Sequence, residues 1–410
     1  MRKSIITFVL LCFTLLLFAQ QSEEEITFMN IVTELYKEIE AARNDKNYKK
    51  AEALCQKTDE TFESLSPNSK KKYRYGKANL YYALTCYQAL QGKKKEAVKS
   101  FSICYENGWI KYSHALKDTD LDNIRKDKKF ISILQKMREE SDYKYILQQA
   151  KGYDRSQQKP ICYNESITDT LPRFTYMNSN DSNLVRVRHY FKLDSVAGAG
   201  NEIEKIKNIL TYIHNKIRHD GQHGNPDEMT SIAMAEACKD GSRGLNCRGL
   251  ATVLNECYLA MGFKSRFITC MPKKYINDCH VINAVYSNTL DKWLWMDPTN
   301  NAYVMDENNN MLSIAEVRER LRNNQPLILN EDANWNNRSK TLKENYLDQY
   351  MAKNLYYVNC SLRSEYGTEN KKFNPADFVA LMPIGYTNDM EKGSSIVNND
   401  TWFWQSPDQD

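Results

Sequence analysis

The sequence lacks the residue patterns that build a zinc site or a nucleic-acid-binding surface. None of its 11 cysteines forms a CxxC pair, and its six histidines show no metal-ligand spacing. Its lysines and arginines are balanced by aspartates and glutamates to a net charge of +4, and no basic stretch is interleaved with stacking aromatics. We therefore expect no metal, no other cofactor and no nucleic-acid partner.

Beyond its first residues the sequence also has no apolar run of the length that a membrane span needs. The run at residues 5–18 is short, follows Arg2 and Lys3, and precedes Ala19 and an acidic polar stretch. This order is typical of a secretory signal. We expect residues 1–19 to be a signal peptide cleaved after Ala19, and the protein to be exported to the periplasm or the cell exterior with no other membrane contact. An uncleaved anchor is the alternative.

The cysteines do not show the spacing of a small disulfide framework. Removal of a signal peptide would take Cys12 with it and leave ten of the 11 cysteines in an oxidising compartment. Cys55, Cys86 and Cys104 occupy apolar positions of helical patterns, where a thiol packs as a small apolar side chain. The sequence leaves the pairing of the others open.

A chain of 410 residues with 41% apolar residues is expected to form two or three packed units. Helical periodicity without strand-like alternation runs from about residue 28 to residue 137. Within it, "YYALTCYQALQGKKKEAVKSFSICYENG" (residues 81–108) resembles a tetratricopeptide helix pair with Gly92 at the turn. We expect residues 20–150 to form an all-α, tetratricopeptide-like region that could hold a protein partner. A generic helical bundle is the alternative.

The rest of the chain predicts an α+β unit with a connector before it and an extension after it. Polar residues with scattered proline and asparagine at 151–183 predict the connector, and residues 184–330 the α+β unit. That unit contains an amphipathic helix at 202–218 and a later helix that begins with a capping box, Ser313 and Glu316. Aromatic, strand-like segments at 331–410 predict a β-rich C-terminal extension, which could also offer a sugar or peptide surface.

The segment "GLNCRGLATVLNECYLAMGF" (residues 244–263) predicts a helix that begins at a cysteine. Asn246 is a suitable N-cap, apolar residues follow Cys247 at helical spacing, and Gly262 ends the pattern. The free amides and the dipole of a first helical turn lower the pKa of a thiol. Cys247 is therefore the candidate nucleophile, although a cysteine considered alone is more often a packing residue.

The segment "CHVINAVYSNTLDKWLWMDPTN" (residues 279–300) predicts a hairpin of two apolar strands around a polar turn. If the turn centres on Asn288 and Thr289, His280 and Asp297 lie opposite each other on one face of the ladder. A register error of one or two residues would still leave them diagonal neighbours. An imidazole held by a carboxylate is a good base for a thiol, so this pair suits the candidate nucleophile.

Together these features resemble the transglutaminase-like superfamily. The resemblance rests on Cys247 at a helix start, His280 at the start of a later strand, and Asp297 before a proline at the end of the next strand. "MGFKSRF" (residues 261–267) also resembles the Gly-hydrophobic-x-x-Arg segment of that superfamily. The resemblance covers about residues 201–321. It implies a papain-like α+β fold in which Cys247 is the nucleophile, His280 the base and Asp297 the residue that orients the base.

Two departures from the related enzymes bear on the reaction. Arg248 follows the cysteine where the eukaryotic cross-linking enzymes have tryptophan, and Gly241 stands six residues before it where papain-type enzymes have glutamine. The Cys247 amide offers one oxyanion donor, and the sequence does not identify a second. Because an acyl-enzyme open to water hydrolyses, a peptidase or amidase with a thioester intermediate is favoured over cross-linking. Its substrates would be amides of peptides, proteins or peptidoglycan-type material. The alternative is a catalytically idle fold that binds protein or glycan.

Three further histidines, His214, His219 and His223, have no carboxylate or cysteine at ligand spacing. We expect them to line the cleft or to face solvent. Trp293 and Trp295 are expected to pack in the core.

Overall fold

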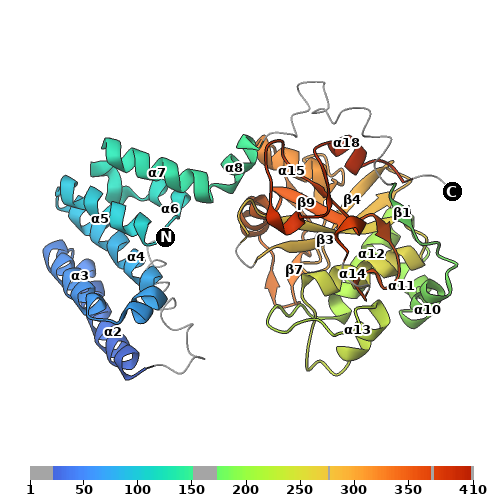
Figure 1. Ribbon diagram of the computed structural model, residues 1–410, viewed down its shortest axis with the longest axis horizontal. Helices are drawn as coiled ribbons and strands as arrows, with labels where there is room; N and C mark the ends of the chain where they lie inside the picture. Colours follow the sequence, from blue (N-terminus) through green and yellow to red (C-terminus); the bar gives the residue numbers. More distant parts are fainter. Residues whose placement is uncertain (1–21, 151–172, 276–277, 371–373, 408–410) are drawn as a thin grey trace. The chain divides into compact units, whose positions relative to one another are not determined.

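The computed structural model describes residues 22–150, 173–275, 278–370 and 374–407 (Figure 1). The chain divides into two compact units, Met1–Asp142 and Tyr143–Asp410. The predicted signal peptide and most of the predicted connector lie outside the described residues. None of the helices in the described ranges is long and apolar enough to cross a membrane.

The first unit is helical throughout its described part, as the periodicity predicts. Helix α4 begins with the N-cap Ser66 and Pro67, and Gly92, at a φ of 78°, makes the turn between α4 and α5. Ala97 and Phe101 are fully buried between these two helices and their neighbours. The tetratricopeptide character of the pair stays a prediction. The helices are α2 (Glu23–Asn44), α3 (Tyr48–Glu63), α4 (Pro67–Leu90), α5 (Lys94–Glu106), α6 (Tyr112–Lys117), η1 (Thr119–Ile124) and α7 (Lys128–Ser141).

The second unit is built on a six-stranded sheet with the order β12-β11-β9-β2-β3-β4. Neighbouring strands are antiparallel except β11 and β12, which are parallel. The strands are β2 (Ser265–Met271), β3 (His280–Ser287), β4 (Lys292–Met296), β9 (Tyr357–Ser361), β11 (Phe378–Leu381) and β12 (Ser395–Val397). β2 and β3 are buried along their whole length. Buried strands of this kind have helices on both faces.

One face of the sheet is covered by helices that come before it in the sequence (Figure 1). Leu250, Val253 and Leu254 of α14 pack there with Val285 and Leu294 of the hairpin. This is the inward helix face that the apolar spacing predicts. The helices on this side are α10 (Ser182–Tyr190), α11 (Leu193–Ala197), α12 (Glu202–Lys216), α13 (Ser231–Ala237) and α14 (Cys247–Ala260).

The other face is covered by α15, by α8, which comes before the sheet in the sequence, and by short helices that come after α15. Trp293 and Trp295 point into this layer and are buried, as predicted. The capping box of Ser313 and Glu316 at the start of α15 is also present. The helices of this layer are α8 (Tyr143–Gln149), α15 (Ile314–Arg322), α16 (Lys343–Asn345), the π-helix η3 (Tyr346–Met351), α17 (Ala352–Asn354) and α18 (Asp400–Phe403).

The C-terminal strands β9, β11 and β12 belong to the same sheet as β2, β3 and β4. β9 pairs directly with β2, so the β-rich C-terminal part completes the central sheet. Shorter elements join the edges and loops of the unit. They are β1 (Thr175–Tyr176), β5 (Val304–Met305), β6 (Ile328–Leu329), β7 (Asn334–Trp335), β8 (Ser339–Lys340), β10 (Arg363–Ser364), η4 (Thr368–Asn370), η5 (Pro375–Asp377) and η6 (Asp389–Glu391).

The second unit also includes segments that the sequence assigned elsewhere. Helix α8, which we expected in the helical region, packs on α15, where Arg322 donates to the carbonyl groups of Leu147 and Ala150. Strand β1, within the predicted connector, pairs with β10. Both contacts join segments far apart in the sequence, which local composition does not reveal. With these additions, the structure has the predicted fold class, an all-α region followed by an α+β unit.

Candidate active site

Cys247 is the first residue of α14, and Asn246 is its N-cap, as predicted. The Asn246 side chain accepts a 3.1 Å hydrogen bond from the Gly249 amide, and the Asn225 side chain bonds both the backbone and the side chain of Asn246. A Cβ on Gly249 would lie 2.7 Å from Asn225 Oδ1, so only glycine allows this approach. The loop at Asn225 thus fixes the helix start that carries the thiol.

His280 and Asp297 lie on one face of the sheet, but their register differs from the predicted one. Ser287 pairs with Lys292 and Asn283 with Met296, so the turn has four residues and Asp297 is a diagonal neighbour of His280. The reason is Glu202 of α12, whose carboxylate accepts hydrogen bonds from Ser287 Oγ and from the amides of Asn288 and Thr289. The predicted side-chain contact nevertheless forms, at 2.8 Å between His280 Nε2 and Asp297 Oδ2.

Cys247 and His280 approach each other around the first residues of β3. The cysteine packs on the α14 side of the sheet, against Ala251, Phe267 and Val281, whereas His280 lies on the other side with Asp297. The thiol and the His280 imidazole line the same cavity, and both the imidazole and the Val281 backbone act on the thiol to lower its pKa. Since Nε2 of His280 is bonded to Asp297, Nδ1 is the nitrogen left for the thiol.

The charges of Cys247, His280 and Asp297 shift one another's pKa values. Burial raises the pKa of Cys247, but the neighbouring His280 lowers it by more, so the thiol pKa lies below its ordinary value. Burial lowers the pKa of His280, and the neighbouring Asp297 carboxylate raises it above its ordinary value by a larger amount. The pKa of Asp297 is held low by His280 despite complete burial. A thiolate facing an imidazolium is the protonation state that these shifts favour.

Asp297 has further partners that the sequence did not reveal. Its Oδ2 accepts from the Tyr346 hydroxyl at 2.5 Å and from Asn300 Nδ2 at 3.0 Å, and its Oδ1 accepts from the Thr299 amide at 2.8 Å. The carboxylate is fully buried and each oxygen is satisfied. Its orientation toward His280 is therefore fixed from three sides.

His219 lies in the same cavity as Cys247 and His280. The indole N–H of Trp335 is 3.3 Å from its Nδ1, and its backbone is bonded twice to the Asn336 side chain. Burial lowers the pKa of His219, and the nearby His280 lowers it further. His219 is therefore neutral, and because Nδ1 accepts from Trp335, its proton lies on Nε2.

The cavity has a volume of about 340 Å³ and is formed by residues from the loop after α12, from α14 and β3, and from the segments after β4. Trp335 and Leu342 stand at its rim with 40% and 51% of their surface exposed. Its lining residues are His219, Cys247, His280, Thr299, Asn300, Trp335, Ser339, Lys340, Thr341, Leu342, Asn345, Tyr346 and Tyr350.

The two other histidines lie apart from this chemistry. His214 is buried and joins α12 to the segment after β4 and to β7, with Nδ1 2.9 Å from the Pro298 carbonyl and Nε2 2.9 Å from Asn334 Oδ1. His223 is exposed and contacts Asp220. Of the three histidines, only His219 lines the cavity.

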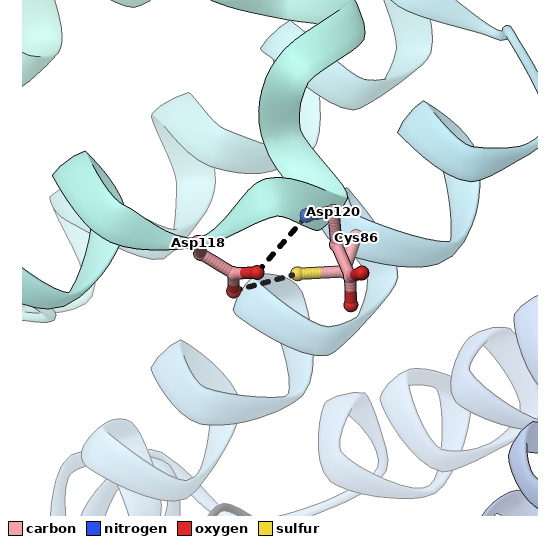
Figure 2. Close-up of side chains that lie close together, drawn as sticks. All are labelled: Cys86, Asp118 and Asp120. Atoms are coloured by element: carbon pink, nitrogen blue, oxygen red, sulfur yellow. Dashed lines mark hydrogen bonds between the residues drawn. The ribbon is translucent and has the colours of Figure 1, made fainter. Parts of the chain in front are cut away.

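Among the described residues, one group has the residue types of a metal site, and it lies in the first unit (Figure 2). The thiol of Cys86 and the carboxylates of Asp118 and Asp120 lie within 4.8 Å of one another. Asp118 already accepts hydrogen bonds from Tyr82 Oη at 2.7 Å, from Cys86 and from the Asp120 amide. These bonds tie α4 to the start of η1, which accounts for the cluster by packing.

A model of a protein family matches one segment of the chain, whereas no curated protein and no solved structure matches it. The matched segment covers about a quarter of the chain and contains Cys247, His280 and Asp297. Residues 191–298 match the model of the transglutaminase-like superfamily, so this part of the chain is a transglutaminase-like domain.

Proposed function

We propose that this protein is a cysteine hydrolase that cleaves amide bonds through a Cys247–His280–Asp297 triad and a thioester intermediate. The observation that carries the proposal is the grouping of the three residues: Cys247 and His280 line one cavity, and His280 Nε2 lies 2.8 Å from the fully buried carboxylate of Asp297. A cysteine kept only for packing does not need a partner whose charge lowers its pKa.

The steps follow from the arrangement. His280 Nδ1 takes the thiol proton, and the Cys247 thiolate attacks the amide carbonyl to form a tetrahedral oxyanion. The same nitrogen then gives the proton to the leaving amine, which departs and leaves the thioester. Water, activated by His280, attacks the thioester and releases the acid. Asp297 keeps the imidazole in the required tautomer and stabilises the imidazolium.

The oxyanion needs two donors, and two groups in the cavity can supply them. One is the Cys247 backbone amide, which is free because it begins a helix. We assign the second to His219 Nε2–H, whose tautomer is set by Trp335. A neutral imidazole that shares the cavity with the thiol suits this role, because it offers a proton without a competing charge.

Hydrolysis suits this site better than acyl transfer to an amine. Arg248 occupies the position after the nucleophile and turns away to pair with Glu369 and Thr269, so no indole covers the thiol from there. The exposed rim at Trp335 and Leu342 leaves the cavity accessible to water. Water is then the abundant acceptor of the acyl group.

We further propose that the protein is exported and that its substrates are amides of peptides, proteins or cell-wall material. The charged, apolar and small residues at positions 2–19 support export. The helical first unit is proposed to hold a protein partner, on the strength of its tetratricopeptide-like α4–α5 pair.

The test is a screen of peptide and cell-wall amides with the wild type and Cys247→Ala. Cleavage by the wild type, absent in the variant, together with a trapped acyl adduct on Cys247 by mass spectrometry, supports the proposal. Slow alkylation of Cys247 by iodoacetamide, no faster than that of the buried cysteines, would overturn it in favour of a binding module.

A further inference from the structure

A second cavity has a volume of about 460 Å³, and its lining residue Cys279 lies near enough to Cys247 for the two thiols to interact electrostatically. Arg248 and Cys279 line it, and these two residues are the direct neighbours in sequence of Cys247 and His280. Thr269 of β2 also lines it, on the α14 side of the sheet. The first cavity instead contains the His280 side chain. A substrate that lies across the Cys247 thiol can therefore extend from the first cavity toward the second.

Three charged side chains line this second cavity, two of them acidic. Arg248 is 3.2 Å from Glu369, so these two charges compensate each other. Arg248 also donates to Thr269 Oγ1 at 3.1 Å, which holds the guanidinium against the wall. The third, Glu391, is left as the excess negative charge.

Glu391 is a buried carboxylate with polar but uncharged contacts. It is 5% exposed and accepts a 2.6 Å hydrogen bond from Asn359 Nδ2, a residue that also lines the cavity. No lysine or arginine forms an ion pair with Glu391 in the part of the chain that the structure describes. Burial raises the pKa of Glu391, and its neutral partners and the charge of Arg248 offset this only in part.

We propose that this second cavity is a recognition pocket for a primary ammonium group of the substrate, with Glu391 as its ion-pair partner. The proposal rests on the proposed function, since it places the ammonium on a substrate bound across Cys247. An ammonium is compact and has three donors, and the carboxylates of Glu391 and Glu369 in the cavity lining can accept from it. An anion would meet two carboxylates, and an apolar group would leave buried polar atoms unpaired.

The ammonium is recognised and does not attack the thioester. An amine paired with a buried carboxylate stays protonated, and a protonated amine has no free electron pair. The pocket therefore selects hydrolysable amides that carry a positive charge near the scissile bond. The charge could come from a terminal α-amino group or from a lysine side chain, and the two differ in the length of the chain that bears it.

The test measures how fast Cys247 in the full-length protein reacts with alkyl methanethiosulfonates that end in either an ammonium or a methyl group. Aminoethyl and aminohexyl reagents represent the short and the long ammonium, and mass spectrometry of the Cys247 peptide isolates the reaction. We expect the ammonium reagent of one length to react faster than its neutral counterpart. In Glu391→Gln this rate ratio should fall about fivefold, the size that loss of one nearby charge produces even in a watery site.

Two further variants sharpen the result. Glu369→Gln leaves Arg248 without its partner, so the ratio should fall there as well. Glu344→Gln removes an exposed carboxylate of α16 outside the pocket and should leave the ratio unchanged. Equal rates for the ammonium and the methyl reagent in the wild type would overturn the proposal that the cavity binds an ammonium. So would a rate ratio that stays unchanged in Glu391→Gln and Glu369→Gln. In that case, rapid iodoacetamide labelling of wild-type Cys247 would still support the proposed hydrolase function. Slow labelling would contradict both the hydrolase function and the ammonium pocket.

Discussion

The Tyr346 hydroxyl donates a 2.5 Å hydrogen bond to Asp297 Oδ2, the same oxygen that contacts His280 Nε2. Tyr346 begins a π-helix, and Tyr350 of the same π-helix lies with its ring 5.3 Å from the His280 ring. π-Helical turns are rare and often stand at functional sites. This one places two tyrosines against the imidazole from a segment outside the family match.

Tyr346→Phe should destabilise the second unit by about 2 kcal/mol at neutral pH, because a buried carboxylate loses one hydrogen bond while the ring stays in place. Urea denaturation followed by tryptophan fluorescence measures this. All tryptophans except Trp109 lie in the second unit, so the signal reports mainly on it. In an Asp297→Asn background, Tyr346→Phe should lower the unfolding free energy by less, since the carboxylate charge that the hydroxyl contacts is already absent. An equal loss in both backgrounds would mean that the Tyr346–Asp297 bond does not carry the effect.

The pH dependence of Cys247 alkylation tests the thiolate. Because the pKa of Cys247 is lowered, its reaction with iodoacetamide should persist at pH values where an ordinary thiol, with a pKa of about 9, has lost its reactivity. In His280→Ala the imidazole that lowers the pKa of Cys247 is lost and burial remains, so the profile should move to higher pH and the rate at pH 7 should fall. Cys257 is buried with a raised pKa and serves as the internal control. Coincident profiles for the wild type and His280→Ala would contradict this view of the pair.

Much of the site can be predicted from the sequence because its signals are local. The N-cap Asn246, the apolar spacing after Cys247 and the hairpin pattern around His280 are each contained within some twenty residues, and all three appear in the structure. The hairpin register was wrong by two residues because Glu202, far away in sequence, bonds to the turn. Local turn propensity holds no information about such a tertiary contact.

The parts that could not be predicted depend on contacts between distant segments. Tyr346 reaches Asp297 from 49 positions away, and Trp335 reaches His219 from 116 positions away. A lone tyrosine or tryptophan in an aromatic-rich segment gives no sign of such a partner. For the same reason β9 could be expected as a strand, whereas its pairing with β2 could not. Side chains that support a site from other segments need the fold before they can be identified.

Glu256 should make the stability of the second unit depend on pH. This carboxylate of α14 accepts hydrogen bonds from the amides of Ser231 and Gly367, and burial raises its pKa to about 7. The folded state therefore binds the proton more tightly than the unfolded chain, whose glutamate pKa is near 4.5. Stability should fall as the pH rises from about 5 to 7.

Glu256→Gln removes this titration. Relative to the variant, the wild type should lose about 2 kcal/mol of unfolding free energy over that pH range. Urea denaturation at several pH values gives the difference. Parallel stability curves for the two proteins would contradict the predicted titration, whatever their absolute offset.

The last prediction concerns how His280 and Asp297 act together. Asp297→Asn should leave the fold nearly intact, because an amide of the same shape can still accept from Thr299 and face Tyr346. It should lower kcat about a hundredfold or more on any substrate that the screen finds, since asparagine cannot stabilise the imidazolium. His280→Ala should cost at least as much. The double variant should be little worse than His280→Ala alone, because Asp297 acts only through the imidazole and residues that work as one unit are not additive. Multiplied losses in the double variant would show that Asp297 contributes by a separate route, and the 2.8 Å contact between the two residues would then be structural rather than catalytic.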